Sequence, residues 1–372
     1  MKVLATAGDI SALIADVRLR VPLTAWAVQY GGSVVWRSFH DCSRADLAAA
    51  DVLVLQRGTS ARACWLSEAM HARGGSVVYD IDDLITEIAP HISHHERSSD
   101  FLPWVRRCMR NSDLVTVSTA RLGAALDGLA PACMEVPNHA FSAGEWPLPL
   151  HDAERPVSLL FASSDRLAAE FLYPVLRRLD AHRARLVLVG PPGADFSAAG
   201  LAVERHPLLP RADFIGLARS LPNPLAVIPL EASRFASCKS AVKWFDYAEA
   251  GIPTLCSAVP PYTDVVEDGV TARLVANDDA AWSAALAAAI GDTAWRERVA
   301  RAARTAVRSR HTIGHTTAAW QQALQEARRR SREHPLPAPA PAWRLKDAIG
   351  SVFESGLLRL RRFNRERLAR RR

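Results

Sequence analysis

The segment Pro229–Val275, PLEASRFASCKSAVKWFDYAEAGIPTLCSAVPPYTDVVEDGVTARLV, decides the fold and indicates a ligand site. Its pattern predicts a buried strand ending in a loop, a helix over Ala241–Ala250, a second strand, and an acidic loop closed by Gly269. Lys239 and Ser240 stand where the helix opens. Backbone N–H groups and the positive end of the helix dipole attract anions there, and Lys239 adds a full charge. The loop is therefore typical of a phosphate site.

Asp246 lies about two helical turns beyond Lys239, within reach of another polar part of the same ligand. A phosphate site combined with a carboxylate for sugar hydroxyls suits a nucleotide or a nucleotide-sugar. The alternative is an ordinary strand–helix connection with a solvated lysine, and the spacing alone allows both.

The segment also contains the order Lys-Ser-x-x-Lys-x-x-Asp-Tyr-x-x-x-Gly-Ile-Pro, followed by Ser257, Pro261-Tyr262 and Glu267-Asp268-Gly269. This order resembles the donor-binding region of GT-B glycosyltransferases, of the bacterial GT4-like (glycosyltransferase family 1) type. The similarity extends more weakly over about residues 1–325. It implies a GT-B fold of two Rossmann-like α/β domains facing a cleft.

The resemblance also implies the reaction. Such an enzyme moves a hexose-type sugar from a nucleotide-sugar to a glycan or lipid-linked glycan, here in the assembly of a bacterial surface polysaccharide. The leaving diphosphate is stabilised in GT-B enzymes by basic side chains and helix N-termini, so neither a metal nor another cofactor is expected. The resemblance favours a retaining reaction, without a residue that proves it.

The donor residues implied by the resemblance lie in two loops. Lys239 and Arg166 are expected to contact the diphosphate and to act in catalysis, and Asp246 to contact the ribose. Ser163 and Ser164 could donate to phosphate oxygens, although Ser-Ser-Asp is equally typical of a plain helix N-cap. The full donor set is Ser163, Ser164, Lys239, Ser240, Lys243 and Asp246.

Two departures from the family are visible. Typical members carry two glutamates eight positions apart, whereas this chain has Cys238 at the first position and Asp246 at the second. The subfamily with Cys-Lys-Ser in this loop uses Lys239 instead. The loop Thr6–Ile10 has one glycine where many relatives have two, so close approach of a ligand to that backbone is less assured.

The acceptor residues are expected in the first half of the chain. Asp82 and Asp83 follow a predicted strand, and either one could orient an acceptor hydroxyl or act as its base. The pattern does not decide between them, and no metal site is expected from Asp80-Ile81-Asp82-Asp83. Arg57 ends another strand, where side chains of open α/β sheets reach ligands.

Other polar residues have weaker signals. Asn138 matches the family's hinge motif, and Arg18 is a cleft candidate beside Arg20, although a solvated helix face is the stronger expectation for both arginines. A histidine cluster in a polar loop is expected to be solvated; it comprises His91, His94 and His95.

Strand-like runs alternate with amphipathic stretches through both halves, which predicts two parallel sheets. The predicted strands are Val3–Ala5, Ser33–Trp36, Val52–Gln56, Ser76–Asp80, Leu114–Ser118, Val157–Phe161, Arg185–Val189, Leu225–Pro229, Thr254–Cys256 and Ala272–Val275. The expected organisation is an acceptor domain over 1–142, a linker over 143–156, a donor domain with a closing helix over 157–332, a Pro/Ala linker over 333–342, and a basic amphipathic tail over 343–372.

The charge is concentrated in the tail. The chain of 372 residues has a net charge of +7, and the ten Lys/Arg and three Asp/Glu of 343–372 account for all of it. An amphipathic helix with interleaved arginines suits an anionic membrane surface, the alternative being a helix docked on the protein. The uncharged body and the lack of a known module argue against nucleic acid as a partner.

The N-terminus lacks a signal-peptide pattern, and the six scattered cysteines indicate reduced thiols, so a cytoplasmic location is expected, with peripheral contact to the inner face of the membrane. Two other functions stay open. One is a degenerate GT-B protein that serves as a nucleotide-binding scaffold subunit. The other is a nucleotide-sugar epimerase, which would have no need of the basic tail.

Overall fold

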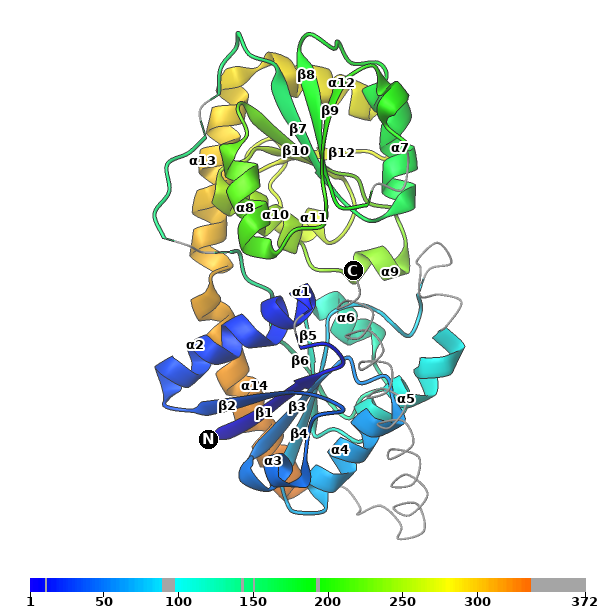
Figure 1. The fold of residues 1–372 in the computed structure, drawn as a ribbon, viewed down its shortest axis with the longest axis vertical. Helices are drawn as coiled ribbons and strands as arrows, with labels where there is room; N and C mark the ends of the chain where they lie inside the picture. Colours follow the sequence, from blue (N-terminus) through cyan, green and yellow to red (C-terminus); the bar gives the residue numbers. More distant parts are fainter. Residues whose placement is uncertain (11, 89–97, 142–143, 150, 192–194, 336–372) are drawn as a thin grey trace, which may run out of the picture. The chain divides into compact units, whose positions relative to one another are not determined.

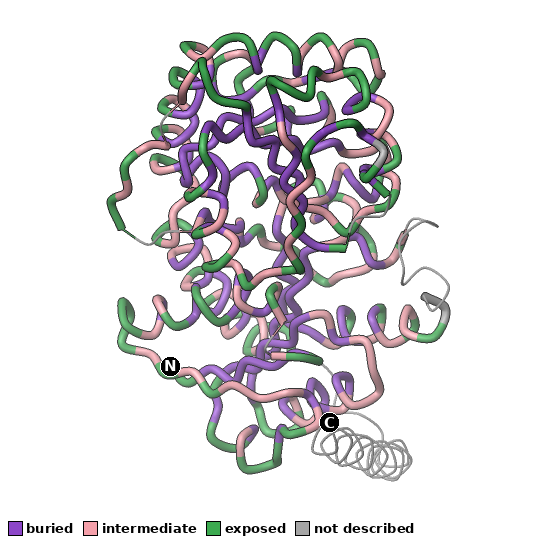
Figure 2. Tube along the Cα trace, turned by 45° about the horizontal axis from the view of Figure 1, so that its top comes forward, coloured by how far each residue is buried: buried purple, intermediate pink, exposed green. Residues whose placement is uncertain are grey.

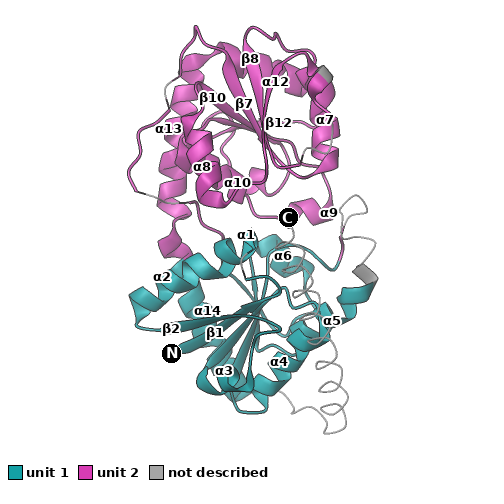
Figure 3. Ribbon diagram, viewed as in Figure 1, with its two compact units in different colours: residues 1–86, 97–136, 317–372 teal, residues 87–96, 137–316 magenta. Residues whose placement is uncertain are grey.

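The computed structural model describes residues 1–335 except 11, 89–97, 142–143, 150 and 192–194. The chain divides into two compact units (Figure 3). Unit 1 comprises 1–86, 97–136 and 317–372, and unit 2 comprises 87–96 and 137–316. Each unit contains one six-stranded parallel sheet, which confirms the predicted α/β class with two parallel-sheet domains.

The sheet of unit 1 has the strand order β2-β1-β3-β4-β5-β6 (Figure 1). Its strands are β1 Lys2–Ala7, β2 Ser33–Ser38, β3 Val52–Gln56, β4 Ser76–Ile81, β5 Leu114–Val117 and β6 Cys133–Glu135. Its helices are α1 Leu13–Ala15, the π-helix η1 Asp16–Arg20, α2 Val21–Tyr30, α3 Arg44–Ala49, α4 Ala61–His71, α5 Ser98–Arg110, α6 Ala120–Ala125 and the part from Thr317 of α14 Ile313–Glu333.

The sheet of unit 2 has the order β12-β11-β10-β7-β8-β9. Its strands are β7 Val157–Ala162, β8 Ala184–Val189, β9 Ala202–His206, β10 Pro224–Ile228, β11 Thr254–Ser257 and β12 Arg273–Val275. Its helices are α7 Arg166–Leu176, the 3-10 helix η3 Ser197–Ala199, α8 Arg211–Ser220, α9 Arg234–Ser237, α10 Val242–Ala250, α11 Tyr262–Val265, α12 Asp279–Gly291 and α13 Thr293–Arg310.

Both faces of the unit 2 sheet are covered, as the alternation of side chains along a strand requires. Leu159 and Phe161 of β7 pack in one apolar cluster with α7 and α12, whereas the intervening Leu160 packs in another with α10 and α13. In unit 1, Trp26 and Trp320 pack on one face of the sheet. The central strands of both sheets are accordingly almost completely buried (Figure 2).

Two strands were missed by the sequence patterns, β6 and β9. Both are edge strands in which exposed or half-exposed residues predominate. A strand that pairs on one side only needs no continuous apolar run, so it lacks the signal by which the central strands were found.

The compact units divide the chain differently from the expected domains. The long segment of unit 2 begins at Pro137 rather than after the predicted linker 143–156, and the end of the closing helix, from Thr317, belongs to unit 1. Trp320 explains the second difference, because it is fully buried in the unit 1 core. The expected tail, 343–372, lies outside the described residues. Among the helices that the structure does describe, all are too short or too polar to traverse a lipid bilayer.

Candidate functional site

The order of the unit 2 strands reverses between β7 and β10, and ligands of open α/β sheets bind outside the carboxyl ends of the strands at such a point. The chain after β10 forms the short helix α9 and then reaches Lys239. The Lys239 ammonium lies 4.6 Å from the centre of the Phe235 ring. The predicted anion loop is therefore located at the reversal point of this sheet.

Helix α10 begins beside this lysine without a side-chain cap. Its N-cap residue is Ala241, whose side chain has no hydrogen-bonding group. The N-cap side chain therefore accepts no hydrogen bond from the first backbone N–H groups of the helix. Those N–H groups and the positive end of the helix dipole are available to an anion. Ser240, one of the predicted donor residues, lies half-buried just before this N-terminus.

Lys243, in the first turn of α10, connects this helix to the end of β7. Its Nζ donates a hydrogen bond of 3.0 Å to the carbonyl oxygen of Ala162. Although the residue as a whole is exposed, protein atoms crowd its ammonium. This burial, together with the charge of Lys239, lowers the pKa of Lys243 to about 8. Two lysines thus meet at the reversal point, where a bound anion would favour the charged form of Lys243.

The loop after β7 forms a helix N-cap, the alternative that the sequence left open for it. The carboxylate of Asp165 accepts hydrogen bonds from the N–H groups of Leu167 and Ala168 at 2.9 and 3.4 Å. The Ser163 hydroxyl accepts from the N–H of Asp165 at 3.0 Å. These bonds already occupy the N-terminus of α7, so this loop has fewer donors to offer a diphosphate than α10 has.

Arg166 and Ser164 complete the predicted part of this loop. Arg166 is more than half exposed and forms an ion pair with Glu170, four residues further along α7. Such surface pairs are weak, so the guanidinium can leave Glu170 for a ligand at little cost. Ser164 is exposed in the same loop.

Asp246 has partners other than the expected ribose hydroxyls. It is buried, and Arg211 donates to both of its carboxylate oxygens, at 2.9 and 2.6 Å. The N–H of Phe141 adds a third hydrogen bond of 2.9 Å, and Arg211 also donates to the carbonyl oxygen of His139 at 2.5 Å. Most of the acceptor capacity of Asp246 is therefore used inside unit 2, where it fixes the chain that follows Pro137.

Arg211 is the site residue that the sequence analysis missed. It opens α8, which follows β9, one of the two strands that were not predicted. The guanidinium matches the Asp246 carboxylate in a bidentate pair, and both side chains are only 9% exposed. The positions are 35 residues apart, and nothing in the local pattern around Arg211 indicates its partner.

In unit 1 the strand order reverses between β1 and β3, and Arg57 follows β3 directly. Its guanidinium donates to Asp82 at 2.5 Å and to Asp83 at 2.6 Å. The structure therefore brings three predicted residues together. Arg57 has a φ of +45°, in the left-handed region that non-glycine residues seldom adopt, and such strain is typical of functional sites.

The two carboxylates differ in their surroundings. Asp82 is buried, whereas the Asp83 side chain is 26% exposed. Burial raises the pKa of Asp82 above its ordinary value, against the opposing effect of the Arg57 charge. A carboxylate with a raised pKa is the better proton acceptor, so Asp82 is the stronger candidate for a base.

The expectation that Arg18 lies on a solvated helix face is wrong. Arg18 is 1% exposed and donates to both oxygens of the fully buried Asp80, at 3.2 and 2.6 Å. It also donates to the carbonyl oxygen of Val136 at 2.5 Å, and its own carbonyl accepts from Trp320. The same expectation is met for Arg20, two residues on, which is exposed and pairs with Asp16.

The remaining predicted residues have structural settings of several kinds. Asn138 is buried near the point where the chain enters unit 2. Arg18 donates to the carbonyl oxygen of Val136 before it, and Arg211 donates to that of His139 after it. The cluster His91, His94 and His95 lies outside the described residues. Within the described part of the chain, no group of three or more His, Cys, Asp and Glu side chains could hold a metal ion.

Comparison with known proteins adds to this geometry. Residues 166–322 match a family model described as glycosyl transferase-like, a span that contains α7, Lys239, α10 and Asp246. No curated protein matched the sequence.

Several solved structures share the fold. Sucrose-phosphate synthase from Thermosynechococcus elongatus aligns with a TM-score of 0.65 at 14% identity, over 88% of this chain and 99% of its own. HepE from Anabaena, in complex with UDP and glucose, aligns with a TM-score of 0.58 at 14% identity, over 87% and 99%. A protein from Listeria monocytogenes described as a UDP-N-acetylglucosamine 2-epimerase aligns with a TM-score of 0.53 at 11% identity, over 91% of this chain and 98% of its own. The expected GT-B fold and the resemblance to GT-B glycosyltransferases are confirmed.

Proposed function

We propose that this protein is a glycosyltransferase that moves a hexose-type sugar from a nucleotide-sugar donor to a glycan or lipid-linked glycan in bacterial surface polysaccharide biosynthesis. The observation that carries the proposal is the anion site of unit 2. Lys239, Lys243 and the uncapped N-terminus of α10 meet at the reversal point of the sheet, inside the span of the family match. HepE, which shares the fold, is described in complex with UDP and glucose.

The chemistry follows from the charge that develops during transfer. When the bond between the sugar and the diphosphate breaks, negative charge collects on the departing diphosphate. Lys239, Lys243 and the N–H groups of α10 would stabilise that charge without a metal ion, with Arg166, Ser163, Ser164 and Ser240 as further contacts. Asp246 we assign to positioning rather than to the ribose, because Arg211 and Phe141 occupy its oxygens.

We propose that Asp82 serves the acceptor, with Arg57 and Asp83 holding it in place. A buried carboxylate of raised pKa suits removal of a proton from an acceptor hydroxyl. A retaining outcome and independence from metal stay part of the proposal, and a cytoplasmic location at the membrane surface goes with them.

The nucleotide released from the donor should stabilise the folded protein. We expect one of UDP, GDP, dTDP, ADP and CMP, at millimolar concentration, to raise Tm without magnesium, since ligand at 100 times its Kd adds about 2.7 kcal/mol. The measurement is a thermal-shift screen with and without magnesium. A shift that needs magnesium would contradict metal independence, and no shift at all would contradict the nucleotide site in unit 2.

The affinity for that nucleotide should depend on pH through Lys243. Its pKa of about 8 means that the free protein loses this charge as the pH rises, whereas a bound diphosphate favours the charged form. Binding above pH 8 therefore takes up a proton, and Kd should rise by up to about tenfold per pH unit. Calorimetric titrations from pH 7 to 9.5 measure this rise. Lys243→Arg should remove it, and a rise that persists in this variant would contradict the assignment.

The second candidate is a nucleotide-sugar epimerase, favoured by the fold shared with the Listeria monocytogenes protein. The two functions differ in what happens to the donor. A transferase releases nucleoside diphosphate only when an acceptor is present, whereas an epimerase converts the nucleotide-sugar to its epimer without one. Product analysis by chromatography, with and without acceptor, distinguishes them.

We propose that the tail carries the protein to anionic membranes. Truncation after Pro341 removes the segment that holds the whole net charge of +7, so binding to anionic vesicles should fall strongly. Activity on a water-soluble acceptor should stay unchanged. Vesicle flotation and a transfer assay measure the two effects, and undiminished, salt-sensitive flotation of the truncated chain would count against the tail.

A further inference from the structure

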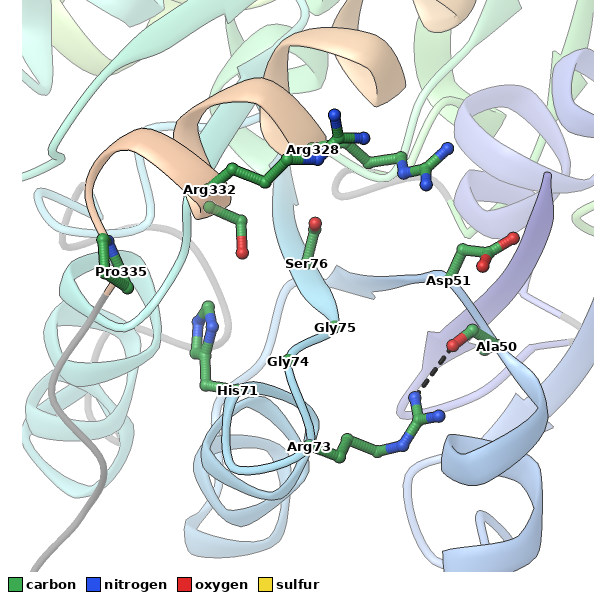
Figure 4. Close-up of a pocket in the computed structure, with 11 residues that line it drawn as sticks. Ala50, Asp51, His71, Arg73, Gly74, Gly75, Ser76, Arg328, Arg332 and Pro335 are labelled. Carbon is green, nitrogen blue, oxygen red and sulfur yellow. Dashed lines mark hydrogen bonds between the residues drawn. The ribbon is translucent and has the colours of Figure 1, made fainter.

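Unit 1 contains a hollow of about 230 Å³ at the amino ends of its strands (Figure 4). Asp51, just before β3, and Ser76, the first residue of β4, lie on its wall. In a parallel sheet all amino ends share one edge, so this hollow lies at the opposite edge from Arg57 and Asp82, which follow the carboxyl ends of β3 and β4. It is therefore separate from the acceptor residues proposed above.

Two arginines of α14, Arg328 and Arg332, line the hollow from the helix above it (Figure 4). They are four residues apart and so share one face of the helix. Within the described residues, neither guanidinium has a hydrogen-bond or ion-pair partner. Their neighbours differ, because Arg329 pairs with Glu326 and Glu333, and Arg330 donates to the carbonyl oxygen of Asp113. The unpartnered arginines of this turn are thus the ones that face the hollow.

Two more basic side chains line the hollow but already have partners. Arg73 donates to the carbonyl oxygens of Ala50 and Ala48 at 2.9 and 2.7 Å, which closes the end of α3. A ring nitrogen of His71 is 3.0 Å from the carbonyl oxygen of Asn111. The Arg73 guanidinium adds positive potential to the wall without competing for the same ligand atoms as Arg328 and Arg332.

The wall includes a single carboxylate, Asp51, whose Oδ2 accepts the backbone N–H of Lys2 at 2.7 Å. Three guanidinium groups therefore face one acid. Arginines in the last turns of a helix are favoured by the negative end of the helix dipole. That effect accounts for their presence near the end of α14, but it does not require two of them to line the same hollow. Ser76, which is buried, places a hydroxyl in the same space (Figure 4).

We propose that this hollow binds a phosphate group, as a monoester, a diester or the free ion. Arg328 and Arg332 supply the charged donors and the Ser76 hydroxyl supplies a neutral one. A phosphate has oxygens that point in several directions, so it can accept from two guanidinium forks and a hydroxyl together, whereas one fork saturates a planar carboxylate. Its source is either a phosphate compound in solution or the headgroup of an anionic phospholipid. The site is independent of the donor site.

The first test measures inorganic phosphate by equilibrium dialysis at constant ionic strength. Lys239→Ala is introduced into every protein, so that the proposed donor site contributes little. We expect R328A/R332A to weaken the affinity at least about tenfold, since charge-assisted hydrogen bonds are lost. The matched control is R298A/R301A on α13, which removes the same charge from two exposed arginines and should leave the affinity unchanged.

The second test addresses the lipid source. Chains truncated after Pro341, which lack the basic tail, are floated with phosphatidylglycerol vesicles. A loss of flotation in R328A/R332A assigns the hollow to a headgroup, whereas a loss in the dialysis alone assigns it to a soluble phosphate. If R328A/R332A matches R298A/R301A in both measurements, the proposal is wrong. R328Q/R332Q replaces the alanine variant if the latter has a lowered Tm.

Discussion

Replacement of Lys239 by alanine is expected to lower the turnover number for sugar transfer by a factor of about 100 or more. Removal of one donor that stabilises developing charge typically has an effect of this size. The fold should persist, because Lys239 is a half-buried loop residue outside the apolar core, and its cation–π contact with the Phe235 ring contributes about 0.5–1 kcal/mol at such partly exposed sites. Initial rates and thermal unfolding measure the two effects.

The control for this variant is Lys2→Ala, which removes an exposed lysine from unit 1. It should change neither rate nor Tm. Lys239→Arg keeps the charge and should recover part of the rate. Unchanged turnover in Lys239→Ala would remove this loop from the diphosphate site, even if the nucleotide still raised Tm.

The central strands and the position of Lys239 at the start of a helix could be predicted from the sequence because both depend on local patterns. β7 and β10 are continuous apolar runs, since they are buried on both faces. Lys239 and the start of α10 are neighbours in the chain, so their proximity needed no knowledge of the fold. The edge strands β6 and β9 lacked that signal because half of their residues face solvent.

The partners of charged side chains could not be predicted, because they depend on contacts between distant segments. Asp246 was identified as a site residue, but its partner Arg211 is 35 positions away. Arg57 was chosen for its place at a strand end, and its pairing with both Asp82 and Asp83 emerges only when β3 and β4 lie side by side. The exposure expected of Arg18 was wrong for the same reason, because its partner Asp80 is 62 positions away.

Replacement of Arg18 by alanine is expected to have the largest effect on stability. Asp80 is completely buried, and without Arg18 its charge would have Thr116 as its remaining side-chain partner, with a hydrogen bond of 2.8 Å. Removal of one member of a buried ion pair typically costs about 3–5 kcal/mol of the free energy of unfolding. Urea unfolding followed by tryptophan fluorescence measures it, because Trp26 and Trp320 lie in the core of the same unit.

The matched control is Arg20→Ala, in the same π-helix but on an exposed pair, where the loss should stay below about 1 kcal/mol. Arg18→Lys keeps the charge and gives up the bidentate geometry, so its loss should be intermediate. If Arg18→Ala and Arg20→Ala lower the free energy of unfolding by the same amount, the buried pair of Arg18 and Asp80 does not stabilise unit 1 as proposed.

Arg18→Lys should also affect function, because Arg18 forms hydrogen bonds with the backbone where the chain leaves and re-enters unit 1. Its guanidinium binds the carbonyl oxygen of Val136, the last residue of unit 1 before the chain enters unit 2, and its own carbonyl accepts from Trp320, shortly after the chain returns. Asp80, its ion-pair partner, precedes Asp82 by two residues in the strand that leads to the proposed base. A charge-conserving change at Arg18 should therefore lower the turnover number more than it lowers the affinity for the nucleotide, whereas Arg20→Lys should alter neither.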